Sequence, residues 1–388
     1  MNQGFLVRII FLLCCWLGMA IHGVAAVSAA TNNINVSDDE KGIKQAIHWY
    51  LNGTSYNDQS QINKAFYVNA RLYLPGKDDA MREMGALEYA QLFPEDKKGQ
   101  FNGRLGRLIS MDVTGDVATA KAEILLLNPG IRFVDVFLLK KIQGTWQIIS
   151  KTAIRENAPQ HGRKILFVVS NAQHYPGTSV STGNNFPELA YAYQTFIKAG
   201  YAVDFVSQQG GSVPLEMINT SDTVQRQHLY SPDFMWALAH TKHPAEIAAK
   251  DYAAINYIGG GSAIIEIADN RAIQAIAMQI YEQQGGVLAA ICQGTQGISN
   301  LKQSNGTYVM SDKVLTSFPD RYLNQQSPVF KAYPFSLENT IKQRKGKFTS
   351  GANGSSHIEV DGRLVTGMNW ESSVAVAEAV IRLLDGKK

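Results

Sequence analysis

The spacing of hydrophobic and polar positions changes along the chain, from a helical period to a strand period. Between residues 38 and 66, apolar side chains recur at helical spacing, which predicts two amphipathic helices with these inner faces: Ile43, Ile47, Tyr50 and Leu51, then Ile62, Ala65 and Phe66. Farther along, apolar residues alternate with polar ones or form short runs, which predicts strands at 108–113, 117–124, 133–139 and 146–151. Helices followed by an antiparallel sheet indicate an α+β fold.

The second half of the chain has a different pattern. Near-continuous apolar runs alternate with amphipathic segments, which predicts strands at 164–170, 202–207, 253–258 and 287–292 and helices at 186–199, 270–284 and 371–384. Two short strands, 358–361 and 363–366, flank a turn near the end. Strands that are apolar throughout are buried on both faces, so we expect an α/β fold with a parallel sheet between helices.

A break in periodicity separates these two halves. Residues 157–163 contain Pro159 and Gly162 and show no periodic pattern, so we predict a linker there. A chain of 388 residues accommodates two domains. We therefore expect one domain at 38–156 and a second at 164–388.

The first thirty residues are typical of a secretory signal peptide. Arg8 precedes an apolar run at 9–20, which is too short for a comfortable membrane span, and small residues follow at 24–30. We predict a cleavable signal at 1–30, a periplasmic or secreted protein and no stable membrane span after cleavage. The alternative is that the segment stays in place as a membrane anchor.

Charge and cysteine content narrow the function classes. The formal net charge of +3 is small, and no stripe of lysine and arginine is present, so we expect no nucleic-acid partner. Cleavage of the signal would remove Cys14 and Cys15 and leave Cys292 as a lone thiol. No internal disulfide is then possible, and such a thiol is either well buried or functionally exposed.

Cys292 lies at the end of the predicted strand 287–292, where Gln293 and Gly294 begin a turn into the next element. A sharp strand–turn–helix connection presents a side chain at the carboxyl edge of an α/β sheet, where ligands bind. This position makes Cys292 a candidate nucleophile. The alternative is a small hydrophobic residue that only fills the core.

Six segments of the second half form a recognisable set in this order: Thr182-Gly183 with Glu188, Gly200 to Ser207, Gly259-Gly260-Gly261, Ala289 to Gly294, Pro334 to Glu338 and Asp361 to Asn369. Through these segments the second half resembles the ThiJ/PfpI superfamily, which has the flavodoxin-like, class I glutamine-amidotransferase-like fold, and in particular its branch of chaperone-type and glyoxalase III-type proteins. An insertion at about 208–244 is also typical of that branch. The resemblance implies an α/β parallel-sheet sandwich with Cys292 at the nucleophile elbow.

The same resemblance implies roles for three neighbours of Cys292. Glu188 matches a glutamate that leans over the cysteine; a carboxyl kept neutral by burial can donate a hydrogen bond to sulfur and favour the thiolate. The backbone N–H groups of Gly260 and Gln293 would stabilise an oxyanion. Alternatively, Glu188 only offsets a helix dipole and Gly260 only forms a tight turn.

The chain departs from the family's Cys-His-acid triad. Gln293 replaces the histidine that often follows the cysteine, and glutamine cannot carry a proton near neutral pH. Leu323 stands at the acid position of one branch, and Asp320 matches the acid of another but has no imidazole to orient. His174 and His357 are the candidates for a substitute base, because each lies in a predicted loop that could reach the carboxyl edge of the sheet.

The first half also contains a recognisable set of segments, at 47–53, 65–66, 114–118 and 144–149. Through them it resembles the nuclear-transport-factor-2-like superfamily, in its lumazine-binding-like group. The resemblance implies a curved sheet wrapped by helices, with a pocket that some relatives use for catalysis and many for dimerisation. We find no convergent acid–base set in this half, take His48 as a surface residue, and expect a homo-oligomer.

These patterns leave several functions open. The first is a cysteine-dependent lyase or hydrolase acting on small carbonyl compounds or acyl groups through Cys292, Glu188, Gly260 and Gln293. The second is a non-catalytic stress-response, redox-sensing or ligand-binding module that dimerises through its first domain. Glutamine amidotransfer is a third reading, which also needs the missing histidine and acid. We expect no metal and no cofactor, since Gly259-Gly260-Gly261-Ser262 lacks dinucleotide-binding spacing.

Overall fold

The computed structural model describes residues 37–76, 80–126, 128, 130–158 and 163–386, so the predicted signal peptide and most of the predicted linker lie outside the described residues. Within these ranges no helix is both long and apolar enough to cross a membrane. The domain boundaries predicted at 157–163 stay a prediction, although one sheet ends at Asn157 and the next begins at Lys164.

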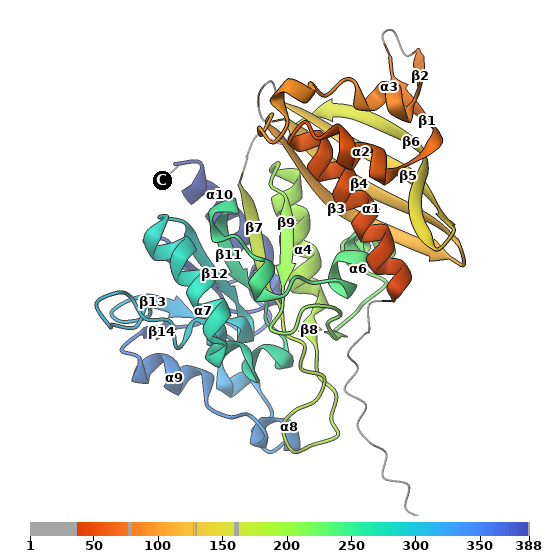
Figure 1. The fold of residues 1–388 in the computed structure, drawn as a ribbon. Coiled ribbons are helices and arrows are strands. Elements are labelled where there is room, and N and C mark those ends of the chain that lie inside the picture. The colour runs from red at the N-terminus through yellow and green to blue at the C-terminus, as the bar shows by residue number, and fades with distance from the viewer. Residues whose placement is uncertain (1–36, 77–79, 127, 129, 159–162, 387–388) are drawn as a thin grey trace, which may run out of the picture. The chain divides into compact units, whose positions relative to one another are not determined.

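The first domain is an α+β unit, as predicted, drawn from red to yellow in Figure 1. Its helices are α1 (Asp38–Ser55), α2 (Gln59–Ala65) and α3 (Ala86–Ala90). Its strands are β1 (Phe66–Pro75), β2 (Met81–Gly85), β3 (Arg104–Thr114), β4 (Val117–Leu126), β5 (Ile131–Ile142) and β6 (Thr145–Asn157). Ser37 begins α1 by accepting a hydrogen bond from the Glu40 N–H at 3.1 Å, and three acidic residues follow in the first turn.

The sheet of this domain has the order β2-β1-β6-β5-β4-β3. Neighbours are antiparallel except β1 and β6, which are parallel. Phe66, which we expected on the inner face of the second helix, is the first residue of β1 instead. A buried apolar residue one position beyond a helix fits either element, so spacing alone assigned it wrongly.

The second domain is the predicted α/β unit, drawn from yellow-green to blue in Figure 1. Its principal sheet contains β7 (Lys164–Val168), β9 (Val203–Val206), β11 (Tyr252–Tyr257), β12 (Val287–Ile291), β15 (Ile358–Asp361) and β16 (Leu364–Gly367). The order is β15-β16-β12-β11-β7-β9, with only β15 antiparallel to its neighbour. Two short pairs, β8 (Asn184–Asn185) with β10 (Leu215–Glu216) and β13 (Val314–Thr316) with β14 (Lys347–Thr349), lie outside it.

Helices cover both faces of this sheet. They are α4 (Phe186–Lys198), α5 (Thr223–Leu229), α6 (Pro232–Ala239), α7 (Arg271–Met278), α8 (Pro328–Lys331), α9 (Leu337–Gln343) and α10 (Ser373–Leu384). The helix predicted at 270–284 ends as an α-helix at Met278 and continues as a π-helical turn, Gln279–Gln283.

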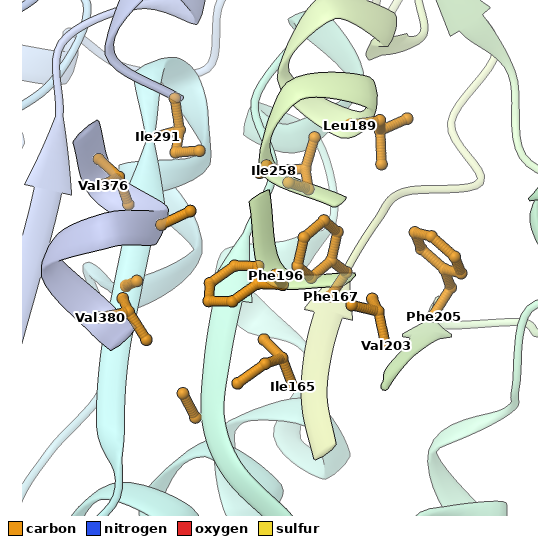
Figure 2. Packing of buried hydrophobic residues seen from close by; sticks show 14 of the residues in the cluster. Ile165, Phe167, Leu189, Phe196, Val203, Phe205, Ile258, Ile291, Val376 and Val380 are labelled. Carbon is orange, nitrogen blue, oxygen red and sulfur yellow. The ribbon is translucent and has the colours of Figure 1, made fainter. Parts of the chain in front are cut away.

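The core follows the alternation of each central strand. Ile165 and Phe167 of β7 face one apolar layer with α4 and α10, whereas Leu166 and Val168 face the other with α7 and α9. In the first layer the rings of Phe167 and Phe196 lie edge to face with centroids 5.8 Å apart (Figure 2). This packing on both faces fixes the carboxyl ends of β11 and β12 side by side at one edge of the sheet.

Candidate active site

Cys292 directly follows β12, whose residues are all buried. Its φ is +55°, in the left-handed region that non-glycine residues rarely adopt, and a short 3-10 turn, Cys292–Ile298, begins at the same residue. Backbone strain of this kind persists where the surrounding structure enforces it, and it is the geometry of a nucleophile elbow. Cys292 is 7% exposed and is the free cysteine of the described residues.

Glu188 reaches Cys292 from the first turn of α4. The Asn185 side chain caps this helix by accepting a hydrogen bond from the Glu188 N–H, which fixes Glu188 in the first turn of α4. The carboxyl is fully buried. Its Oε2 accepts a hydrogen bond from the Gly259 N–H at 2.7 Å.

The other oxygen, Oε1, has no nitrogen or oxygen partner among the described residues. The Cys292 thiol and the Glu188 carboxyl nevertheless interact closely enough for each group to shift the pKa of the other. The structure therefore brings the two predicted site residues together. The carboxyl acts on the thiol and accepts the Gly259 N–H, so it is more than a dipole partner for α4.

Burial raises the pKa of both groups. Desolvation is the largest influence on Glu188 and raises the pKa of its carboxyl from 4.5 to about 8. The interactions with Gly259 and Cys292 lower this pKa, but by less than desolvation raises it. Desolvation also raises the pKa of the Cys292 thiol, followed by the charge of Glu188, while the Gln293 N–H lowers it. At neutral pH the carboxyl is therefore neutral, as expected, but the resting sulfur is a thiol. The expected bias toward the thiolate is wrong for this resting state.

Glycines at the end of β11 permit this close packing. A Cβ on Gly259 would lie 2.8 Å from the Ile291 carbonyl oxygen and 2.9 Å from both the Cys292 Cβ and the Glu188 Oε2. Gly260 has a φ of +101°, and a Cβ there would lie 2.3 Å from the carbonyl oxygen of Gly183. Only glycine fits at these two positions.

The two proposed oxyanion donors, the N–H groups of Gly260 and Gln293, differ in whether they already interact with another group. The Gly260 N–H makes no hydrogen bond with any residue in the described part of the chain. The Gln293 N–H lowers the pKa of the Cys292 thiol and so favours its ionised form. Their joint role as an oxyanion site stays a prediction, with one donor open and the other already at the nucleophile.

The Gln293 side chain belongs to an aromatic wall that the sequence did not reveal. Its amide donates a hydrogen bond to the Tyr333 hydroxyl. The rings of Tyr333 and Tyr175 stack at 5.8 Å, and burial raises the pKa of both phenols. Tyr175 lies in the loop after β7 and Tyr333 follows α8, so no local motif links them. The only sequence signal was the placement of the neighbouring His174 in a loop that could reach this edge.

Glu216 is a second carboxyl near the site, and it comes from the insertion at 208–244. β10 pairs in parallel with β8, so that Glu216 lies beside Asn185. Its carboxylate accepts hydrogen bonds from the N–H groups of Gly261 at 2.8 Å and Gly183 at 3.0 Å. Burial raises the pKa of Glu216, and its charge also acts on Cys292. The branch-typical insertion was the signal that could have led to this residue.

The remaining polar candidates have other partners. The Nε2 of His357 lies 3.1 Å from the Thr349 hydroxyl and 3.4 Å from a carboxylate oxygen of Glu359. His174 forms a backbone bridge with Ser181.

The acid candidates from the later segments are also accounted for. Asp320 accepts hydrogen bonds at the start of α9, from the Ser336 hydroxyl and from the Leu337 N–H. Leu323 follows a short 3-10 turn and carries no ionisable group. Within the described ranges, no group of three or more His, Cys, Asp and Glu side chains is arranged to hold a metal.

Comparisons with known proteins agree with the two-domain fold. Residues 38–152 match the family described as "Putative lumazine-binding", and residues 183–383 match the DJ-1/PfpI family. The glutathione-independent glyoxalase hsp3102 of Schizosaccharomyces pombe is 28% identical over 237 residues, which cover 58% of this chain and 98% of that protein. The glutathione-independent glyoxalase HSP31 of Saccharomyces cerevisiae is 28% identical over 238 residues, with 58% and 98% covered.

A solved structure also shares the fold of the second domain. Glyoxalase III of Candida albicans superposes with a TM-score of 0.52 at 23% identity, covering 57% of this chain and 97% of that one. The second domain thus confirms the ThiJ/PfpI-type sandwich predicted from the sequence, and the first confirms the nuclear-transport-factor-2-like α+β domain. With Cys292 at the elbow of a parallel sheet and Glu188 beside it, the chain belongs to the DJ-1/PfpI family and carries a lumazine-binding-type domain before it.

Proposed function

We propose that this protein is a cysteine-dependent enzyme that converts small 2-oxoaldehydes, such as methylglyoxal, into 2-hydroxy acids without glutathione. One observation carries the proposal: the buried Glu188 carboxyl, whose pKa is raised to about 8, interacts with the Cys292 thiol and keeps one oxygen without a hydrogen-bond partner among the described residues. A proton-transfer group works best when its pKa lies near the working pH. The glyoxalase names of the yeast relatives support the same substrate class.

The proposed reaction needs only the protein thiol and water. The sulfur of Cys292 adds to the aldehyde carbon, and the thiol proton passes through Glu188 to the carbonyl oxygen, giving a hemithioacetal. The neutral Glu188 carboxyl then gives its proton to the ketone oxygen and takes the hydrogen from the sulfur-bearing carbon as a proton, giving an enediol. It returns this proton to the neighbouring carbon while it takes the proton of the first hydroxyl group, which gives a thioester and restores the neutral carboxyl. Water cleaves the carbon–sulfur bond and releases the 2-hydroxy acid and the free thiol. No oxidant or reductant is consumed.

Each group in the site has a defined part in this sequence. Because the resting sulfur is a thiol, its proton must leave as the carbon–sulfur bond forms; the neutral Glu188 carboxyl takes it while passing its own proton to the aldehyde oxygen. The open N–H of Gly260 is available for the oxygen that becomes negative. Gln293 cannot act as a base, so Glu188 carries each proton transfer.

The test is lactate formation from methylglyoxal by the processed protein, with and without added glutathione. We expect turnover that does not depend on glutathione, is abolished in Cys292→Ala, and falls by about 10²–10⁴-fold in Glu188→Gln. Glu378→Gln, an exposed carboxyl on α10, is the matched control and should retain activity. Equal turnover in Cys292→Ala and the parent protein would overturn the proposal.

The second candidate is a redox-sensing or ligand-binding module without turnover. It is favoured by Gln293 at the position of the usual histidine and by the raised pKa of the thiol. Selective sulfenic or sulfinic acid at Cys292 after mild peroxide, together with no lactate formation, would support this function. Absence of both reactions would leave Cys292 as a core residue and contradict both candidates.

We also propose that the mature protein acts in the periplasm or outside the cell, as a homo-oligomer. The support is the signal-like pattern of residues 1–30 and the family of the first domain. Amino-terminal sequencing of protein recovered from the periplasmic fraction should begin near residue 31. An intact amino terminus in the membrane fraction would favour the anchor, and sedimentation of a monomer would refute the oligomer.

A further inference from the structure

A cavity of about 330 Å³ lies within the first domain, apart from the cysteine site. Strands β1, β3, β5 and β6 contribute to it, together with α3 and the segment that follows this helix. Most of its wall is apolar or aromatic, formed by Leu74, Pro75, Leu92, Phe93, Phe133 and Ala153. Such a wall favours the flat, apolar body of a small organic molecule.

A buried polar network forms another part of this cavity. Lys151 and Asp135 make an ion pair at 3.0 Å, and their side chains are only 3% and 2% exposed. The Tyr50 hydroxyl donates a hydrogen bond to the second Asp135 oxygen at 2.5 Å and lies 3.0 Å from the hydroxyl of Tyr89. The free-energy cost of removing two charges from water exceeds what a single contact between them recovers, unless their remaining hydrogen-bond donors also find acceptors.

The lysine still has donors to offer. An ammonium group carries three N–H donors, and in the described part of the chain Asp135 is the ion-pair partner recorded for Lys151. Both oxygens of Asp135 are engaged, one by Lys151 and one by Tyr50. The Lys151 ammonium also lies 5.7 Å and 5.5 Å from the ring centres of Tyr50 and Tyr89. Because Lys151 lines the cavity, an acceptor bound there can use its remaining donors.

Arg104 contributes a second cation with free donors. Its guanidinium lies 5.6 Å from the ring centre of Phe93 and 6.0 Å from that of Phe133. Its Nε is buried and has no partner among the described residues, and no carboxylate in those ranges forms an ion pair with it. The charge of Arg104 also acts on the buried polar network. Burial and the charge of Asp135 raise the pKa of Tyr50, whereas the charge of Arg104 lowers it.

We propose that this cavity binds a small planar organic anion, an aromatic carboxylate, with its ring along the aromatic wall and its carboxylate between Arg104 and Lys151. Two cations and one carboxylate leave the cavity with one unbalanced positive charge, which a monoanion neutralises. Arginine and lysine donors to a carboxylate form the stronger, charge-assisted class of hydrogen bonds. Flat rings stack on phenylalanine and arginine at little entropic cost.

The test is calorimetric titration of the processed protein with 2-naphthoate and with its neutral counterpart, 2-naphthamide. We expect 2-naphthoate to bind at least about tenfold more tightly, because only the acid uses the cationic donors. Arg104→Gln should weaken 2-naphthoate binding by about tenfold or more. Arg82→Gln, an exposed arginine on β2, should not. Cys292→Ala should leave the affinity unchanged, which places the ligand outside the cysteine site.

Several results would overturn the proposal. They are equal affinity for the acid and the amide, unchanged 2-naphthoate binding in Arg104→Gln, and no binding of 2-naphthoate at millimolar concentration. The comparison of acid and amide uses the unaltered protein, so it stays decisive even if Arg104→Gln fails to fold. A lost affinity in Cys292→Ala would instead assign the ligand to the second domain and contradict the proposed site.

Discussion

Replacement of Glu188 by glutamine removes an ionisable group from the core while it keeps the side chain's shape. The amide oxygen can still accept the Gly259 N–H, and the amide nitrogen lies toward the sulfur of Cys292. In the parent protein, burial raises the pKa of this carboxyl from 4.5 to about 8. Between these two pH values, the folded protein keeps a proton that the unfolded chain has released.

The sign and size of the effect follow from this difference. Because the folded state binds the extra proton, the contribution of Glu188 to stability is fully present below pH 4.5 and falls by about 1.4 kcal/mol per pH unit as the pH rises toward 8. The whole loss is on the order of 5 kcal/mol. Glu188→Gln carries no such group. Its stability relative to the parent should therefore rise by this amount across the same window.

The assay is urea unfolding of both proteins at pH 5, 6, 7 and 8, followed by tryptophan fluorescence. The two domains can unfold in separate transitions, so each transition is fitted by itself. The control Glu378→Gln measures how the loss of an exposed carboxyl in the same domain changes the free energy of unfolding at each pH. A free-energy difference between Glu188→Gln and the parent that stays constant from pH 5 to pH 8 would refute the raised pKa and the neutral carboxyl at this site.

Three further predictions concern the same site. Because the Glu188 charge raises the thiol pKa, Glu188→Gln should shift the pH profile of Cys292 alkylation by iodoacetamide to lower pH, and an unchanged or higher midpoint would contradict this coupling. Gly259→Ala should lower the free energy of unfolding of the second domain by about 1–3 kcal/mol, because its Cβ would lie within 3 Å of backbone and side-chain atoms. In the control Gly85→Ala the Cβ enters open space, so the free energy of unfolding in urea should change far less. Gln293→His should raise kcat/KM for methylglyoxal by about tenfold or more and add a pH dependence near 6.5, and unchanged kinetics would show that no base is missing there.

The sequence predicted the parallel sheet well because its strands are buried on both faces. A strand covered on both faces is apolar at every position, and the strands predicted at 253–258 and 287–292 differ from β11 and β12 by only one residue at either end. By contrast, β1 and β2 were missed. Their side chains are largely exposed or half-buried, so neither an apolar run nor a clear alternation marks them.

The candidate site was predictable where it rests on local motifs. Cys292 and the glycines at the end of β11 are encoded by strand–turn junctions, and Glu188 lies at a fixed distance from Thr182-Gly183. Glu216, Tyr175 and Tyr333 were not predictable, because a loop, an insertion and a late helix bring them to the sheet edge only in three dimensions. The thiol's protonation was also misjudged, since desolvation depends on packing that a sequence does not show.

The acid–base network of the first domain was missed for a related reason. Asp135 and Lys151 are charged residues in strands, and such residues usually mark a solvated face. The strand period holds the signal that was overlooked: Asp135 shares its parity with Phe137 and Leu139, which are buried. A charge on the inner face of a strand indicates a polar network in the core.

The central claim is that the Cys292 sulfur can react at the sheet edge while Glu188 serves it. A crystal structure of the processed protein after exposure to iodoacetamide at neutral pH tests this most directly. We predict continuous density from the sulfur into the acetamide group, with the new carbonyl oxygen within hydrogen-bond reach of the Gly260 N–H or the Glu188 carboxyl. An unmodified sulfur sealed in hydrocarbon, or a Glu188 carboxyl turned away from the adduct, would contradict the account.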